Sequence, residues 1–88
     1  MITSVHSEKT FTSNYEDVYF TISKNIKKYR KVNKMTQYDL AVKSGYSYAY
    51  IRRIEGPKCI KNFSIQTIYN ISKALEIPIK NLFDNKDI

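Results

Sequence analysis

Residues 36–54 read TQYDLAVKSGYSYAYIRRI, and this stretch decides the fold. Ala41 lies four residues after Gln37, and Gly45 lies four residues after Ala41. A small residue at position 41 lets two steeply crossing helices approach closely, and Gly45 accepts the positive φ of a tight turn without steric cost. The stretch therefore predicts two short helices joined by a turn.

The second of these helices is expected to be apolar inside and basic outside. Ile51 and Ile54 are predicted to be buried, together with Leu40 of the first helix. The outward residues are then Ser47, Tyr48, Ala49, Arg52 and Arg53. A short helix that presents two arginines suits the reading of a DNA major groove, so DNA binding is the leading hypothesis.

Composition and charge support this hypothesis. The chain has 88 residues, of which 42% are hydrophobic, and these values fit one small globular domain. Residues 23–61 hold eleven Lys or Arg residues against two acidic ones, although the whole chain has a net charge of only +7. Such a concentration is typical of a phosphate-binding surface. The alternative is a solvated basic surface, or the lysine-rich composition of a protein from an AT-rich genome.

The sequence contains no pattern of an enzyme or a metal site. Cys59 is the single cysteine and His6 the single histidine, so neither a disulfide nor a zinc site is expected. Asp39 and Glu55 fall in different helices without a His or Cys partner, which argues against acid–base catalysis. We expect no catalytic residue, no metal, no cofactor and no small-molecule ligand. The eight tyrosines are better explained by packing and groove contacts than as stacking platforms for single strands.

A cytoplasmic location is expected. No apolar run approaches the ~18 residues that a membrane span requires, and the first twenty residues are too polar for a signal peptide.

Five helical segments and no strand are predicted, which makes the fold class all-α. Val18, Ile22, Ile26 and Tyr29 recur at helical spacing and predict the first helix. A capping box of Ser13 and Glu16, three residues apart, would start this helix at Asn14. Residues 1–13 are therefore predicted to be a flexible N-terminal arm.

The next three helices share one start signal, an apolar residue, a Thr or Ser cap, and an apolar residue four positions after the cap. The sets are Met35–Thr36–Leu40, Tyr46–Ser47–Ile51 and Phe63–Ser64–Ile68. Gly56-Pro57 ends the third helix, the fourth runs from about Ile65 to Leu75, and a short helix follows Pro78. Residues expected to face inward in the last two helices are Ile65, Ile68, Ile71, Ser72, Leu75, Ile79, Leu82 and Phe83. The helix-turn-helix domain is predicted to span residues 14–83, followed by a frayed tail, 84–88.

Residues 22–83 resemble the Cro/C1-type helix-turn-helix domain, also called the XRE family. The residues that carry the resemblance are Ile26, Arg30, Thr36, Gln37, Leu40, Ala41, Gly45, Ile51, Ile54, Glu55, Ile68, Ala74, Leu75, Leu82 and Phe83. The resemblance implies a compact, lambda-repressor-like five-helix bundle with its recognition helix at 47–55. The sequence departs from the pattern at Tyr46, where a small aliphatic residue is more usual, and in a longer segment between Glu55 and Ser64.

The resemblance also implies site residues. The implied base contacts are Ser47, Tyr48, Ala49, Arg52 and Arg53. The implied phosphate contacts are Gln37, Tyr38, Lys43, Tyr50, Lys58 and Lys61. An ion pair between Arg30 and Glu55 is expected to brace the first helix against the recognition helix.

Three functions are compatible with this sequence. The first is a transcriptional regulator, such as a repressor, that binds double-stranded DNA as a homodimer on a palindromic operator. The second is the DNA-binding antitoxin of a toxin–antitoxin pair, and the third is a protein-interaction adaptor on the same fold. The outward arginines favour the first two over the adaptor.

Overall fold

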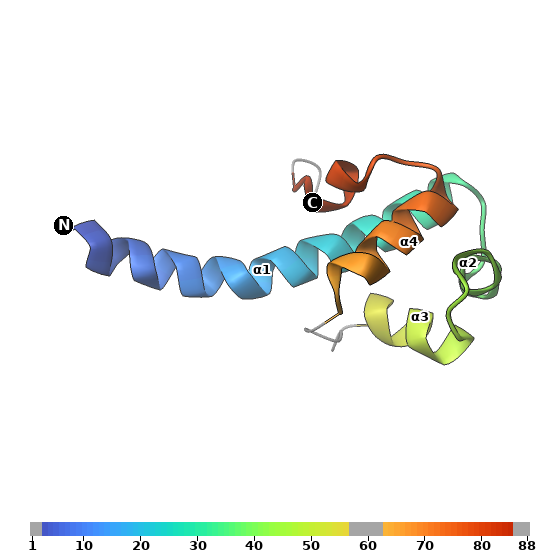
Figure 1. The fold of residues 1–88 in the computed structure, drawn as a ribbon, viewed down its shortest axis with the longest axis horizontal. Helices are drawn as coiled ribbons and strands as arrows, with labels where there is room; N and C mark the ends of the chain where they lie inside the picture. The colour runs from blue at the N-terminus through green and yellow to red at the C-terminus, as the bar shows by residue number, and fades with distance from the viewer. Residues whose placement is uncertain (1–2, 57–62, 86–88) are drawn as a thin grey trace.

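The computed structural model describes residues 3–56 and 63–85, with side chains from residue 18 onward. It contains four α-helices, α1 (Thr3–Val32), α2 (Gln37–Ser44), α3 (Tyr48–Glu55) and α4 (Ile65–Leu75), followed by the 3-10 helix η1 (Ile79–Phe83). No strand occurs in the described residues. The predicted all-α bundle is confirmed. In Figure 1, α1 runs through the molecule as a long axis, with α2 and α3 at one end and the N-terminus at the other.

The start of α1 corrects the sequence-based prediction. The helix begins at Thr3 rather than at Asn14, so Ser13 and Glu16 lie inside it and not at its start. Residues 3–13 are helical. Neither Gly nor Pro occurs before Gly45, so no residue of this segment strongly disfavours continuation of the helix. The division of the chain after residue 13 stays a prediction.

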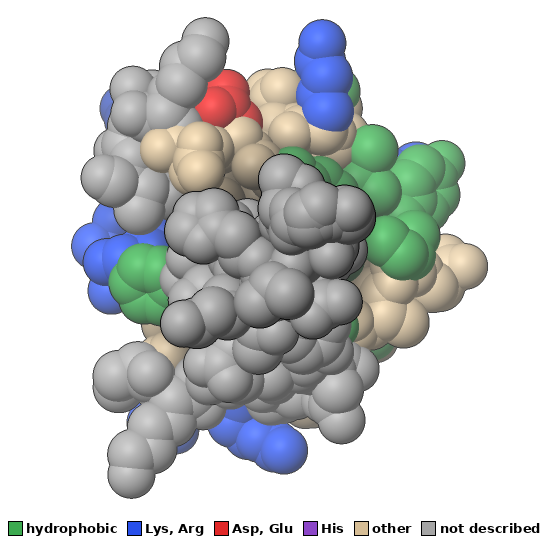
Figure 2. Space-filling view, turned by 90° about the vertical axis from the view of Figure 1, so that its left-hand side faces the viewer, with side chains coloured by type: hydrophobic (Ala, Val, Ile, Leu, Met, Phe, Trp, Pro, Cys, Tyr) green, Lys and Arg blue, Asp and Glu red, His purple; other side chains and the backbone are tan. Residues whose placement is uncertain are grey.

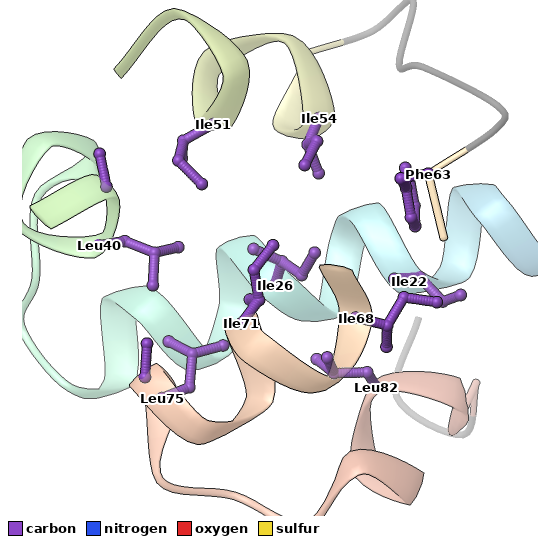
Figure 3. Packing of buried hydrophobic residues seen from close by; sticks show 12 residues of the cluster. Ile22, Ile26, Leu40, Ile51, Ile54, Phe63, Ile68, Ile71, Leu75 and Leu82 are labelled. Carbon is purple, nitrogen blue, oxygen red and sulfur yellow. The ribbon is translucent and has the colours of Figure 1, made fainter. Parts of the chain in front are cut away.

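The core is formed where α1, α2, α3, α4 and η1 meet (Figure 3). Its buried hydrophobic residues are Ile22, Ile26, Leu40, Ala41, Ile51, Ile54, Phe63, Ile68, Ile71, Ala74, Leu75 and Leu82. Isoleucine and leucine from every helix interdigitate there, and burial of such side chains contributes about 1.5–3 kcal/mol each. This core fixes the short α2 and α3, which are too brief to be stable alone.

Polar side chains on α1 fasten the other elements to it. The Asn25 Nδ2 atom donates to the backbone oxygens of Leu82, at 2.9 Å, and Asp84, at 2.7 Å. The Ser23 hydroxyl donates to the backbone oxygen of Ile54 at the end of α3. Because Ser23 and Asn25 are buried, these bonds replace hydration and fix how α3 and η1 lie against α1.

Two residues expected to face inward are instead exposed. Ile65 is 65% exposed and Phe83 is 42% exposed, because they stand at the ends of α4 and η1, beyond the core. With Val18, Tyr19 and Phe63 they help to line a surface groove that has no charged residue in its lining. Seen from the end from which α1 projects, the larger group of visible hydrophobic side chains lies to the right and a smaller one to the left (Figure 2).

Candidate nucleic-acid interface

The caps and the turn place α2 and α3 as the sequence predicts. The Thr36 hydroxyl accepts a hydrogen bond from the backbone N–H of Asp39 at 2.9 Å, and the Ser47 hydroxyl accepts from that of Tyr50 at 3.0 Å. Gly45 ends α2 with φ +83° and ψ +12°, the left-handed conformation. A side chain at this position would be strained, so the glycine has a direct role in aiming α3.

A capping box, which the sequence analysis did not foresee, strengthens the start of α2. The backbone N–H of Thr36 donates to Asp39 Oδ2 at 2.9 Å, reciprocating the bond from Asp39 to the threonine hydroxyl. Hydrogen bonds from the Thr36 backbone N–H, and next from its hydroxyl, lower the pKa of Asp39 below its usual value of 3.8. The carboxylate therefore supports the helix start when it is ionised.

The two faces of α3 separate the core from a polar surface. Ile51 and Ile54 have no exposed area. The expected base-contact residues are all exposed: Ser47, Tyr48, Ala49, Arg52 and Arg53. This face is free to meet a ligand without any change in the core.

An open hollow lies where α1, α2 and α3 meet. Its lining consists of Lys27, Gln37, Ala49, Arg52, Arg53, Glu55 and Gly56. Three of these side chains are cations that converge from α1 and α3, although Glu55 adds one carboxylate. Three of the five predicted base contacts, Ala49, Arg52 and Arg53, therefore line the same hollow as the predicted phosphate contact Gln37.

Lys27 is a member of this site that sequence reasoning missed. It is exposed on α1 and follows Ile26, so the local pattern indicates only that its side chain points away from the core. Its place beside Arg52 and Arg53 depends on the packing of α1 against α3. In the sequence, only the family resemblance, which implies that the first helix packs against the recognition helix, indicated that a residue of α1 could reach this site.

The structure brings Arg30 and Glu55 together as the resemblance implied. Arg30 Nε donates to Glu55 Oε2 at 2.8 Å and Nη2 donates to Oε1 at 2.9 Å, which makes a bidentate pair. The side chains are only 9% and 2% exposed. Arg30 Nη1 also donates to the backbone oxygen of Met35, at 2.8 Å, so one guanidinium joins α1, the segment before α2, and α3.

Aromatic contacts order the outer surface of α3. The Arg52 guanidinium lies over the Tyr48 ring, 5.6 Å from its centre, within the range of a cation–π interaction. The Tyr38 ring of α2 meets the same tyrosine edge-on, with ring centres 6.4 Å apart. Tyr48 therefore connects Arg52 to α2 and limits the rotamers that this arginine adopts.

The remaining predicted phosphate contacts differ in their surroundings. Tyr38 is exposed, whereas Tyr50 is half-buried and packs on the Tyr46 ring with 5.1 Å between ring centres. Lys43 is exposed and pairs with Glu76 at 3.2 Å, away from the hollow. Lys58 and Lys61, like Cys59, lie outside the described residues.

Comparison with known families identifies the fold. A family model described as helix-turn-helix, HTH_3, matches residues 26–82. The chain belongs to the helix-turn-helix family. This is the Cro/C1-type group that the sequence resembles, and its members are DNA-binding regulators of transcription. The chain is therefore a DNA-binding protein of this group.

A solved helix-turn-helix structure is similar over most of the chain. It is the high-resolution crystal structure of the restriction-modification controller protein C.AhdI from Aeromonas hydrophila. The TM-score is 0.67 and the sequence identity 25%, and the similarity covers 74% of this chain and 96% of that chain. No curated protein sequence matches significantly.

Within residues 3–56 and 63–85, no cluster of three or more His, Cys, Asp or Glu side chains is placed to hold a metal ion. None of the described helices is long and apolar enough to cross a membrane.

Proposed function

We propose that this chain is a sequence-specific regulator of transcription that inserts α3 into the major groove of double-stranded DNA. One observation carries the proposal. The exposed residues Ala49, Arg52 and Arg53 of α3 line the same hollow as Lys27 of α1 and Gln37 of α2. A helix that enters a groove needs exposed side chains of this kind, flanked by groups that donate hydrogen bonds to the phosphates.

Arg53 and Ala49 are the proposed readers of base edges. An arginine fork donates two parallel hydrogen bonds to guanine O6 and N7, and this is the commonest specific contact in the major groove. The methyl group of Ala49 suits close approach to a thymine methyl group. Ser47, Tyr48 and Arg52 are assigned to the margin of the contact, since Arg52 is already stacked on the Tyr48 ring.

The phosphate contacts are assigned to both sides of α3. Gln37 at the start of α2 lies beside backbone N–H groups and the positive end of a helix, which attract an anion. Lys27 adds a contact from α1. Tyr38, Lys43 and Tyr50 stay candidates of the second rank, and Lys58 and Lys61 remain predictions from the sequence.

We further propose that two copies bind a palindromic operator. A single short helix reads only a few base pairs, so pairing two copies is the usual way to gain specificity. Two copies of this chain would repel one another where the cations of residues 23–61 face each other. The groove beside Val18, Ile65 and Phe83 has no charged residue in its lining, so we propose it as the surface through which the two copies pair.

A narrower candidate follows from the similar structure. Because C.AhdI is a restriction-modification controller protein, control of restriction–modification genes is a candidate role for this chain as well. Restriction and methyltransferase genes beside the coding sequence would support this role. A neighbouring toxin gene would favour the antitoxin alternative.

Selection from a random pool of DNA duplexes tests the proposed function. The purified chain should enrich one sequence motif, and pairing of two copies predicts an inverted repeat. Enrichment of a single half-site would refute the dimer but keep the reading by α3. If no duplex is retained even at low salt, DNA binding itself is refuted and the adaptor alternative gains support.

A further inference from the structure

The Gln37 side chain is held by the buried carboxylate of the ion pair. Its Nε2 atom donates to Glu55 Oε1 at 3.1 Å. The same Oε1 atom also accepts from Arg30 Nη2 at 2.9 Å. Gln37 is the first residue of α2 and a lining residue of the hollow, so the contact joins the core-side ion pair to the surface proposed to meet DNA.

Chemistry fixes which way this amide faces. A carboxylate paired with a guanidinium is ionised and only accepts hydrogen bonds, so the nitrogen of Gln37, and not its oxygen, must face Glu55. One of the two N–H bonds is then used. The second N–H and the amide oxygen stay available on a side chain that no longer rotates freely.

We propose that Glu55 is a positioning residue for DNA contact, acting through the Gln37 amide. The inference rests on the proposed function and deepens it. The carboxylate orients Gln37 so that its second N–H is directed at a phosphate oxygen of the bound duplex. An amide that is ordered before binding loses less conformational freedom in the complex, and this raises affinity.

The charge arrangement explains why Glu55 acts indirectly. A free carboxylate beside the DNA would repel phosphates. Here the side chain is only 2% exposed and its charge is matched by the bidentate Arg30. Arg30 also holds the Met35 carbonyl, two residues before Gln37, so the backbone that carries the amide is fixed by the same network.

A double-mutant cycle read by DNA affinity tests the proposal. The probe is the duplex that the wild-type chain enriches from a random pool. Gln37→Ala should weaken binding about tenfold in the wild-type background, as expected for one hydrogen bond to a charged group. In the Glu55→Asp background, whose shorter carboxylate does not reach the amide, the same change should cost less than about twofold.

The matched control is Lys43→Ala, introduced into the same two backgrounds. Lys43 makes no contact with the network, so its effect on affinity should be equal in both. A general loosening of the fold by Glu55→Asp would alter both cycles, and circular dichroism confirms that each variant is folded. An equal loss from Gln37→Ala in the two backgrounds, or no loss in either, would overturn the proposal.

The side-chain amide of Gln37 gives a second readout, which needs no variant of Glu55. In nuclear magnetic resonance spectra of the free wild-type chain, one Gln37 amide proton should be displaced downfield and protected from exchange. Gln66, whose amide donates to the neutral Asn70 side chain at 3.0 Å, is the internal reference. Gln37→Ala identifies the signal by its loss.

The two readouts distinguish the possible failures. Gln37 amide protons that exchange as freely as those of a solvated side chain would overturn the contact, whatever the DNA result. Ordered amide protons in a chain that binds no duplex would show that the proposed function has failed, and the positioning role with it. Ordered protons together with a coupled cycle support both.

Discussion

Arg53 is the residue on which the proposed base reading depends. It is exposed on α3 and lines the hollow, where its fork is free to meet a guanine. Arg53→Ala should cost about 1–3 kcal/mol of binding free energy on the selected duplex and relax the preference at one base pair. Binding titrations with single-base variants of the duplex measure both effects. Lys43→Ala should weaken all duplexes alike, and an unchanged preference in Arg53→Ala would mean that α3 is oriented differently.

Gly45 is the residue that sets the angle between α2 and α3. A Cβ atom built at this position meets nothing within 4 Å, so any cost of substitution comes from the backbone conformation at φ +83° and not from a clash. Gly45→Val should lower the free energy of unfolding by more than about 1 kcal/mol. Gly45→Asn is the control, because asparagine tolerates this conformation. Equal stability of the two variants in chemical denaturation would contradict the assignment.

Single residues were predictable where a local rule determines them. The left-handed glycine and the burial of Leu40, Ile51 and Ile54 follow from spacing and turn chemistry. The predicted burial of Ile65 and Phe83 was wrong. Periodicity predicts which face of a helix points inward, but not how far along the helix that face is covered by other elements. The hydrogen bonds donated by Ser23 and Asn25 could not be predicted from local sequence. The acceptor of Ser23 is 31 residues away, and those of Asn25 are 57 and 59 residues away.

Among the elements, α2 begins with a capping box whose contribution to stability depends on pH. Hydrogen bonds from the Thr36 backbone N–H and hydroxyl keep the pKa of Asp39 in the folded chain below 3.8, its ordinary value in an unfolded chain. The resulting stabilisation is present above pH 3.8 and is lost as pH falls through the folded-state pKa. Asp39→Asn, which keeps the shape but not the charge, should flatten the dependence of the melting temperature on pH in this acid range. An identical acid dependence in both proteins would contradict the capping role.

The brace between α1 and α3 has a measurable coupling. Because the Arg30–Glu55 pair is buried, removing one partner should destabilise the fold by about 3–5 kcal/mol. A thermal-unfolding cycle with Arg30→Ala, Glu55→Ala and the double variant should show strong coupling. The exposed Lys43–Glu76 pair, with side chains 52% and 77% exposed, is the control and should couple by less than about 1 kcal/mol. Coupling near zero in both pairs would mean that the brace contributes nothing.

Element boundaries followed the sequence wherever a cap or a breaker was present. Thr36, Ser47 and Ser64 begin α2, α3 and α4 as predicted, and Gly45 and Gly56 follow the ends of the first two. The predicted start of α1 was wrong because the spacing of Ser13 and Glu16 matched a capping box, although no helix-breaking residue precedes them. A cap motif predicts a helix start only when the residues before it disfavour helical backbone angles.

At the scale of the whole fold, two surfaces of the described residues separate cations from apolar side chains. The hollow between α1, α2 and α3 gathers cations, while the groove beside Val18, Ile65 and Phe83 has no charged lining. This arrangement suits a chain that meets a polyanion with one face and a second copy with another. The concentration of positive charge in residues 23–61 was predictable from composition, but the convergence of Lys27 on the α3 arginines depends on the packed fold.

The central claim is that the α3 face binds DNA and distinguishes sequences. Fluorescence anisotropy of the selected duplex, titrated with the wild-type chain at increasing salt, tests it most directly, with an unrelated duplex of equal length as competitor. Affinity for both duplexes should fall linearly on logarithmic axes, with a slope near −0.9 for each phosphate contacted, while the selected duplex stays preferred at every salt concentration. Equal affinity for the two duplexes would contradict sequence reading by α3, and the absence of binding at low salt would contradict the account as a whole.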